Sequence, residues 1–436
     1  MMLLGTQRIN ERGHLEIGGV DTTALAADLG TPLYVMDEAA LRQKCRDYLS
    51  AFGKRYPRVE VSFASKAFIC AGICKVVEQE GLNLDVASSG ELYTALHAGF
   101  PTERISVHGN NKSVEELKMA LDARVGHLVI DNFYEIDLLT DLAKGLKKPQ
   151  PVLLRVAPGI DPQTHKRIST GQVDSKFGFN AGSGAVMTAV SRVREIAGLK
   201  LQGIHCHVGS QLLDTECHEE SVAIMVDLLA QVKHEFGIEL EELNIGGGLG
   251  IRYLESQQPP SLDEFAEVVT GVIKRKLDEA GLAYPKLLQE PGRSLVGEAG
   301  TTLYTVGSIK QIPGVRTYLS VDGGLSDNPR PSLYDAKYEV LVANKADQPH
   351  DVVVTVAGKH CETDTLFTDV ALADPQPGDI LAVQSTGAYN FVMASNYNRF
   401  RRPPVVLVNE GKADLLVRRE TFEDLIARDL IPARLQ

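Results

Sequence analysis

The chain has 436 residues, enough for two domains, and its hydrophobic (44%) and charged (23%) contents are ordinary for a soluble globular protein. Its net charge of −12 disfavours nucleic acid or an anionic membrane as a partner. No apolar stretch approaches the length of a membrane span, about 18 residues.

The N-terminus carries a four-residue apolar run without a basic region, so we expect no secretory signal. Six cysteines are scattered through the chain, which fits reduced thiols in a cytoplasmic protein better than a disulfide framework. Cys70 and Cys74 are close in sequence, but no second cysteine pair completes a zinc site. We therefore predict no metal.

Two early runs, HLEIGGV (residues 14–20) and TPLYVMD (residues 31–37), are typical of strands. They precede the main repeating pattern of the chain. We expect residues 1–36 to join a later β domain, which would then be discontinuous.

From Val59 onward, short apolar runs that end in polar or glycine residues alternate with amphipathic helical stretches. Eight such units over about 230 residues predict an α/β fold, a (β/α)8 TIM barrel, which we place at residues 37–293. A doubly wound sheet is the alternative. The eight runs are VEVSFAS, LNLDVAS, RISVHGN, HLVIDN, PVLLRVAPG, LQGIHCHVGS, ELNIGGG and KLLQEPGR.

Beyond residue 300 the pattern changes to strand-like runs joined by turn residues, such as TTLYTVGSIKQI, DVVVTVAG and DILAVQSTGAY. Residues 294–436 are therefore predicted to form a C-terminal β-sandwich or β-barrel domain.

Lys66 ends the first barrel run, in the sequence VSFASKAF. One interpretation is a strand-end lysine whose stem packs while its ammonium reaches water. The other is a reactive amine bonded to a carbonyl cofactor. In such barrels the chemistry gathers at the carboxyl ends of the strands, so the neighbouring strand ends bear on the choice.

Those strand ends carry suitable partners. The glycine run in NIGGGLGI allows a close backbone approach to an anion, although a simple tight turn is also possible. His207 and Ser210, in HCHVGSQ, offer an aromatic face and a hydroxyl. Glu290, in QEPGR, offers a carboxylate for a protonated ring nitrogen. A lysine, a phosphate cradle, a stacking ring and this carboxylate are together the requirements of pyridoxal 5'-phosphate.

These motifs make the sequence recognisable. It resembles the fold type III, alanine-racemase-like pyridoxal-phosphate decarboxylases, and among them most closely the diaminopimelate decarboxylase family. The resemblance covers nearly the whole chain and rests on several motifs in the same order: FASKAF, DVASSGEL, HCHVGSQ, NIGGGLGI, EPGRSLVGEAG, VDGGLSDNPRPSLY, GKHCETDT and GAYNFVMASNYNRFRRP.

The resemblance implies a role for each matching residue. Lys66 would hold the cofactor aldehyde, His207 would stack on the ring, and Cys361 would donate a proton; these three are the predicted catalytic residues. The predicted cofactor-binding residues are Lys66, Asp85, His207, Ser210, Gly248, Glu290, Gly292, Arg293 and Tyr389. The predicted substrate-binding residues are Arg293, Arg330, Tyr334, Glu362 and Tyr389.

Two motifs depart from the family pattern. Phe63 and Phe68 stand where the lysine motif more often has tyrosine and asparagine. The cysteine motif reads C-E-T-D-T instead of the common C-E-S-x-D, so the role of Asp364 stays open.

The charges that the resemblance places at the far end of the substrate indicate what binds there. Arginine presents a fork suited to a carboxylate, and Glu362 can accept from an ammonium. A distal group with both charges fits meso-2,6-diaminopimelate, with L-lysine and carbon dioxide as products. A substrate that ends only in a cation, such as ornithine, would be repelled by two arginines. The resemblance further implies a homodimer in which the loop of Cys361 enters the site of the other subunit.

Three alternatives remain for the function. A racemase of this fold would need a second base and has no use for the CETDT motif. A decarboxylase of another amino acid would lack the arginine pair. A catalytically inactive relative should have lost Lys66 or Cys361, and both are present.

Overall fold

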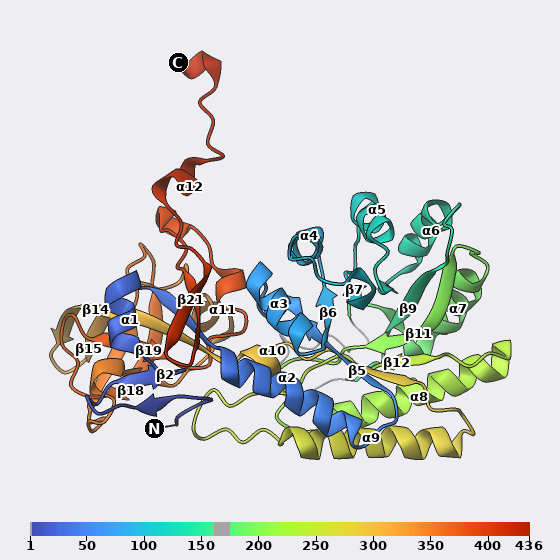
Figure 1. Ribbon diagram of the computed structural model, residues 1–436, viewed down its shortest axis with the longest axis horizontal. Helices are drawn as coiled ribbons and strands as arrows, with labels where there is room; N and C mark the ends of the chain where they lie inside the picture. The colour runs from blue at the N-terminus through green and yellow to red at the C-terminus, as the bar shows by residue number, and fades with distance from the viewer. Residues whose placement is uncertain (1, 161–174) are drawn as a thin grey trace. The chain divides into compact units, whose positions relative to one another are not determined.

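The computed structural model describes residues 2–160 and 175–436, and these divide into two compact units. One unit comprises residues 42–251 and 258–295, and the other comprises residues 1–41, 252–257 and 296–436. Figure 1 shows helices around parallel strands in the first unit and mostly β-strands in the second. Among the described residues, no helix has the length and apolar character needed to cross a lipid bilayer.

The first unit is a closed barrel of parallel strands, so the predicted (β/α)8 fold is confirmed. Each barrel strand pairs with the next, and β8 pairs with β9 while β13 pairs with β5, which closes the ring and excludes a doubly wound sheet. The barrel strands are β5 (Val59–Ala64), β6 (Asn83–Val86), β7 (Ile105–Val107), β8 (His127–Ile130), β9 (Gln150–Ala157), β11 (Leu199–Cys206), β12 (Glu242–Asn244) and β13 (Lys286–Gln289). Each lies within or overlaps one of the eight predicted runs.

Helices follow the strands because their apolar residues recur at helical spacing and pack against the barrel. Ser113 and Ser261 each form a capping box with a glutamate three residues on, which fixes where α5 and α9 begin. The helices of this region are α2 (Glu38–Gly53), α3 (Ala71–Gln79), α4 (Ser89–His97), α5 (Val114–Ala123), α6 (Phe133–Leu142), α7 (Ala185–Arg194), α8 (Glu216–Phe236), α9 (Leu262–Glu279) and α10 (Arg293–Val296). A short strand, β10 (Phe179–Asn180), pairs with β9 outside the ring.

The second unit is built on one large sheet with the strand order β18-β17-β15-β14-β4-β20-β21, and β16 and β19 pair alongside β14. The early strand β4 lies in this sheet between β14 and β20. The strands are β4 (Leu33–Asp37), β14 (Gly300–Ile312), β15 (Arg316–Val321), β16 (Val340–Val342), β17 (Val352–Ala357), β18 (Thr365–Leu372), β19 (Ile380–Val383), β20 (Val405–Asn409) and β21 (Lys412–Val417).

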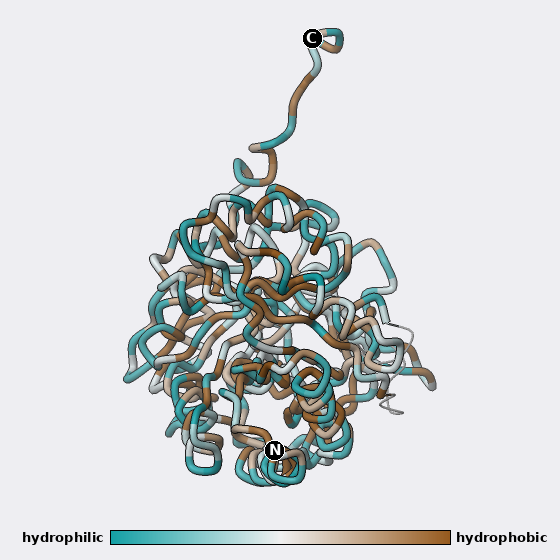
Figure 2. The backbone as a smooth tube through the Cα atoms, turned by 90° about the vertical axis from the view of Figure 1, so that its right-hand side faces the viewer, coloured by the Kyte–Doolittle hydropathy of each residue, from teal (hydrophilic) through white to brown (hydrophobic). Residues whose placement is uncertain are grey.

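The earliest residues form a separate small sheet within this unit. It contains β1 (Arg8–Ile9), β2 (Leu15–Ile17) and β3 (Val20–Asp21), and α1 (Thr22–Leu29) follows it. A buried apolar cluster joins Leu15 and Leu25 from this segment to Leu303 and Val406 of the large sheet. In Figure 2 the outer loops are mostly hydrophilic, and hydrophobic stretches run through the interior. After α12 (Phe422–Ile426) the chain extends away from the sheets, and Leu430 is 90% exposed (Figure 1).

Candidate active site

The carboxyl ends of the barrel strands bring together the ionisable residues expected there. Lys66 lies in a short 3-10 helix, η1 (Ser65–Ala67), directly after β5, and its side chain is exposed. Asp85 lies near the end of β6, and Glu290 directly follows β13, which pairs with β5; both are buried. A lysine and two carboxylates thus share one end of the barrel.

Glu290 accepts three hydrogen bonds from side chains of other strands. His108 Nε2 lies 3.0 Å from Oε1, His205 Nε2 lies 2.9 Å from Oε2, and Asn244 Nδ2 donates to Oε1 at 2.6 Å. Asp85 lies beside this group, with 3.7 Å between its Oδ1 and His108 Nε2. These bonds hold the buried carboxylate in one orientation.

The electrostatics of this cluster are unusual because two carboxylates are buried together. Burial would raise the pKa of Glu290, but His108 and His205 hold it well below its ordinary value. Burial raises the pKa of Asp85 to about 6, although the positive charge of His108 opposes this. Burial lowers the pKa of His205 to about 4, so this ring is neutral near pH 7. Perturbed groups that gather in this way are typical of active sites.

The run of glycines after β12 is required because the backbone of neighbouring strand ends passes very close to it. A Cβ on Gly246 would lie 2.4 Å from the carbonyl oxygen of Cys206, and one on Gly247 would lie 2.2 Å from that of Glu290. Gly246 and Gly248 also have positive φ values of 65° and 136°. Only glycine therefore lets this loop pass between the strand ends.

A hydroxyl and a guanidinium lie in the same unit. Arg293 is buried and donates from Nε and Nη2 to Ser210 Oγ at 3.2 and 3.1 Å. Gly292 is buried, and a Cβ there would lie 3.1 Å from that of Ala64. The backbone N–H of Gly247 donates to His207 Nδ1 at 3.4 Å, which orients that ring. Burial, with Lys66 and Arg155, lowers the pKa of His207 far below its usual value, so the imidazole is neutral.

In the β-sheet unit, Tyr334 and Tyr389 lie beside Arg330. Arg330 is buried at the start of α11 (Arg330–Tyr334) and donates from Nε to the hydroxyl of Tyr338 at 2.8 Å. Its guanidinium carbon lies 5.4 Å from the ring centre of Tyr334 and 5.8 Å from that of Tyr389. Tyr389 has a positive φ of 61°, which is uncommon for an aromatic residue and marks a conformation that the surroundings impose.

Cys361 and Glu362 are exposed on a loop that side chains from a later segment hold in place. The backbone N–H of Cys361 donates to Asn398 Oδ1 at 2.9 Å, and Tyr397 donates its hydroxyl proton to Glu362 Oε1 at 3.1 Å. Both partners belong to the 3-10 helix η6 (Tyr397–Arg399). The thiol and the carboxylate are thus presented outward from an anchored loop.

Asp364 fixes the same loop from its buried side. One of its carboxylate oxygens accepts from the backbone of Leu325 at 2.8 Å, and the other accepts from the backbone and the Nδ1 of His360 at 3.1 and 2.5 Å. A Cβ on Gly324 or Gly358 would lie within 2.1 Å of this carboxylate. The altered C-E-T-D-T motif therefore keeps an aspartate that shapes the cysteine loop.

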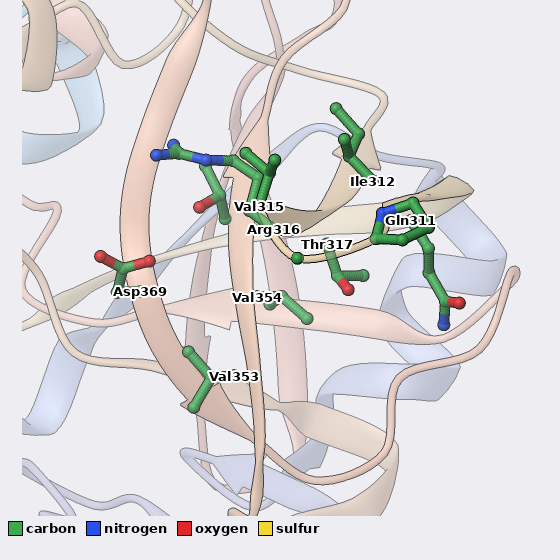
Figure 3. A pocket seen from close by; sticks show the side chains of 11 residues that line it. Gln311, Ile312, Val315, Arg316, Thr317, Val353, Val354 and Asp369 are labelled. Carbon is green, nitrogen blue, oxygen red and sulfur yellow. The ribbon is translucent and has the colours of Figure 1, made fainter.

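An open groove of about 590 Å³ in the β-sheet unit lies between the β14–β15 turn and the β17–β18 strands (Figure 3). Arg316, Val353 and Asp369 are among its lining residues. None of the predicted catalytic, cofactor-binding or substrate-binding residues lines it, so it is separate from the sites described above.

Comparisons with known proteins agree with this geometry. Residues 38–297 match the family model described as the pyridoxal-binding domain of pyridoxal-dependent decarboxylases. The chain is 49% identical over 431 residues to diaminopimelate decarboxylase from Bacillus subtilis, covering 99% of this chain and 98% of that protein. The chain belongs to the diaminopimelate decarboxylase family.

Further members of the family show the same likeness. The enzyme of that name from Synechocystis sp. is 46% identical over 441 residues, covering 99% of this chain and 93% of the relative. The crystal structure of the M. jannaschii diaminopimelate decarboxylase in complex with L-lysine has a TM-score of 0.93 and 35% sequence identity, and each chain is 99% covered.

The barrel residues fit the cofactor of the diaminopimelate decarboxylase family, pyridoxal 5'-phosphate. The guanidinium of Arg293, the hydroxyl of Ser210 and the glycine loop are donors and a cradle suited to a phosphate. Glu290 is an ionised carboxylate suited to a protonated ring nitrogen, and Lys66 supplies the amine. These side chains and the glycine loop therefore have the chemistry needed to bind pyridoxal 5'-phosphate.

Several residues of these sites were missed at the level of sequence. His205 and Asn244 bind Glu290, Tyr338 binds Arg330, and Tyr397 and Asn398 hold the cysteine loop. A signal existed for two of them: His205 lies in β11 two positions before His207, which directly follows that strand, and Asn244 ends the strand before the glycine run. Tyr397 and Asn398 lie in the motif GAYNFVMASNYNRFRRP, but nothing in that motif singled them out, and Tyr338 lies in a loop sequence without a local pattern.

Proposed function

We propose that this protein decarboxylates meso-2,6-diaminopimelate to L-lysine and carbon dioxide, with pyridoxal 5'-phosphate as cofactor. The observation that carries the proposal is the ionised carboxylate of Glu290 at the strand end next to that of Lys66, in a barrel of this family. When bound, the cofactor supplies the electron sink that the departing carboxylate requires. We expect the enzyme to act in the cytoplasm.

The barrel residues are assigned to the cofactor. Lys66 would hold its aldehyde carbon, the neutral ring of His207 would stack on its ring, and Glu290 would face its ring nitrogen. Asp85 lies next to the His108–Glu290 pair, and Tyr389, from the β-sheet unit, would contact both cofactor and substrate. Ser210, Gly248, Gly292 and Arg293 would bind the phosphate region.

The far end of the substrate is assigned to Arg330, Tyr334 and Glu362, together with Arg293. Arg330 is buried and its Nε is fixed by Tyr338, so the fork is pre-oriented for a carboxylate. The carboxylate of Glu362, oriented by Tyr397, suits the distal ammonium. Ornithine has no distal carboxylate and would leave the buried arginine without a ligand.

The decisive experiment measures carbon dioxide release from meso-diaminopimelate, ornithine, lysine and arginine, with and without added cofactor. Turnover of diaminopimelate alone, dependent on the cofactor, is the expected result. Arg330→Ala should lower kcat/KM at least about tenfold because a charge-assisted hydrogen bond is lost. Arg316→Ala, at an exposed arginine of the same unit, is the control. Release from ornithine at a comparable rate would refute the substrate assignment.

We also propose a homodimer whose sites are shared, with Cys361 of one subunit donating the proton in the other's barrel. A thiol is mostly protonated near neutral pH and can deliver a proton to one face of the reacting carbon. The exposed, anchored loop of Cys361 suits this role.

Mixing two inactive variants tests the shared site. Lys66→Ala and Cys361→Ala should together recover up to about a quarter of wild-type activity after random subunit exchange, because half of the dimers are mixed and each has one intact site. Exchange without any recovery would mean that each site is built from one chain.

A further inference from the structure

Glu290 belongs to a row of buried, hydrogen-bonded side chains, some of which are charged and some neutral. Two of its partners are imidazoles and one is an amide, and all three donate to it at 2.6–3.0 Å. One of these imidazoles, His108, also faces the second carboxylate, Asp85, at 3.7 Å. The order across the barrel end is therefore Asp85, His108, Glu290 and His205.

The two histidines differ in what surrounds them. His108 lies between two carboxylates, and their attraction raises its pKa although burial and Arg155 act in the opposite direction. Among the described residues His205 is hydrogen-bonded to one carboxylate, that of Glu290, and burial leaves it neutral. Its Nδ1 has no partner among the described residues, which fits a neutral ring that carries its proton on Nε2 and donates it to Glu290. The histidines thus make similar hydrogen bonds but contribute different charges.

We propose that His108 is a positioning residue that carries a buried positive charge, keeps Glu290 ionised, and thereby keeps a proton on the ring nitrogen of the bound cofactor. His205 and Asn244 orient the same carboxylate as neutral donors. This inference rests on the proposed function, because it assigns Glu290 to the ring nitrogen. Within the row of Asp85, His108 and Glu290, two carboxylates and one imidazolium leave one negative charge in excess, which a protonated ring nitrogen balances. The buried guanidinium of Arg155 also acts on these carboxylates, but its own nearest carboxylate is Asp131, at 3.7 Å.

Loss of the charge on His108 predicts a specific failure. Without it, Asp85 and Glu290 would be two buried carboxylates with no cation between them, and a proton would be taken up by the pair. A protonated Glu290 no longer favours a proton on the ring nitrogen. Loss of His205 removes one hydrogen bond and no charge, so the ring nitrogen should stay protonated.

A metal ion is the competing interpretation of this cluster. One ligand atom from each of His108, His205 and Glu290 lies within 4.8 Å of the others, which is compatible with a small cation. Such an ion would need the lone pairs of both Nε2 atoms, but both face carboxylate oxygens at hydrogen-bond distance. The geometry favours protons over a metal.

The test is nitrogen-15 NMR of holoenzyme reconstituted with cofactor labelled at the ring nitrogen. Wild type and His205→Asn should show the signal of a protonated ring nitrogen. His108→Asn should lose that signal and show the unprotonated one, for which Glu290→Gln provides the reference. If His108→Asn does not fold, His108→Gln replaces it.

A protonated ring nitrogen in folded His108→Asn and His108→Gln holoenzyme would overturn the proposal, and so would a stoichiometric metal ion that is lost in His205→Asn. Failure of the proposed function is distinguishable, because the wild-type protein would then bind no cofactor and give no signal.

Discussion

The barrel buries a glutamate at each end, and the two are held by different kinds of partner. At the amino end, Glu242 begins β12 and pairs with His127 Nε2 and with Lys286 Nζ, each at 2.8 Å. These partners lower its pKa to about 2 although burial acts in the opposite direction. Lys286 is also bound by Glu60 at 2.8 Å and is partly exposed. At the amino end each carboxylate is therefore paired with a basic side chain, as expected of a cluster that supports the fold.

At the carboxyl end, Glu290 is bound by two imidazoles and an amide and has no lysine or arginine in hydrogen-bond contact among its described partners. The neighbouring Asp85 is also buried, and its pKa is raised to about 6. The raised pKa of Asp85 means that its ionised form lowers stability near neutral pH, whereas the lowered pKa of Glu242 means that its ionised form raises stability. The difference indicates that the carboxyl end is kept for chemistry at the expense of stability.

The largest expected effect comes from neutralising the carboxyl-end glutamate. Glu290→Gln should lower kcat roughly 10²–10³-fold, as is typical when a pre-oriented electrostatic partner is removed. The free energy of unfolding near pH 7 should also fall, because the fold holds the pKa of Glu290 below its ordinary value and its ionised form therefore contributes to stability. Steady-state kinetics with saturating cofactor and denaturant unfolding measure the two quantities. Wild-type kcat in this variant would contradict the functional reading of this end.

The matching change at the amino end should lower stability without lowering kcat. Glu242→Gln should lower the free energy of unfolding by about 2–3 kcal/mol, because charge-assisted bonds to a lysine and a histidine are replaced by neutral ones. The kcat of the holoenzyme should stay within about twofold of wild type, since the residue lies at the barrel face away from the chemistry. Denaturant unfolding checks the first expectation and steady-state kinetics the second.

Glu60→Gln is the control for that experiment. Glu60 binds the same lysine at the same distance, but its side chain is 37% exposed. An ion pair at that exposure contributes less than about 1 kcal/mol. If Glu60→Gln and Glu242→Gln lost the same free energy of unfolding, burial would not explain the contribution of Glu242 to stability.

The sequence predicts most of the fold and the type of site, but not every strand or the role of every site residue. The eight barrel strands were predictable because each ends in polar or glycine residues before a helical stretch. β18 was not predicted, because Asp369 has a φ of 54° and register shifts between β17 and β18 interrupt the alternation of its side chains. Asp364 could not be interpreted because its carboxylate depends on space left by Gly324, about 40 residues earlier.

The partners of Glu290 show the same limit within the active site. The motif EPGR identified the carboxylate, but His108 and His205 come from strands 182 and 85 residues away. Whether a strand residue faces into the barrel depends on register across neighbouring strands, which local periodicity does not give. The type of site was therefore predictable, and its internal hydrogen bonding was not.

The contributions of Asp85 at the carboxyl end and Glu242 at the amino end to the free energy of unfolding should depend on pH with opposite signs. The raised pKa of Asp85, about 6 against 3.8, means that its favourable contribution is complete at low pH and is lost as pH rises between these values. Asp85→Asn apoprotein should therefore match wild type near pH 4 and be more stable by about 3 kcal/mol near pH 8.

Glu242 has the reverse sign. Its pKa is lowered from 4.5 to about 2, so its contribution is present above the higher value and is lost as pH falls between them. The deficit of Glu242→Gln should be full near pH 7 and vanish toward pH 2. Unfolding curves at several pH values measure both variants, and differences of the same sign at the two ends would contradict the comparison.

The smallest expected effect concerns the neutral neighbours of the amino-end cluster. Ser106 Oγ lies 3.4 Å from His127 Nδ1, on the opposite side of the ring from Glu242, and Ser106 is buried. Ser106→Ala should lower the free energy of unfolding by about 0.5–1 kcal/mol, the usual contribution of a neutral hydrogen bond. Because the serine acts on Glu242 only by orienting the shared imidazole, the loss should shrink in a Glu242→Gln background. A double-mutant cycle measures that coupling. Strict additivity would mean that the serine and the glutamate stabilise the barrel independently, and that the amino end is a set of separate contacts instead of one cluster.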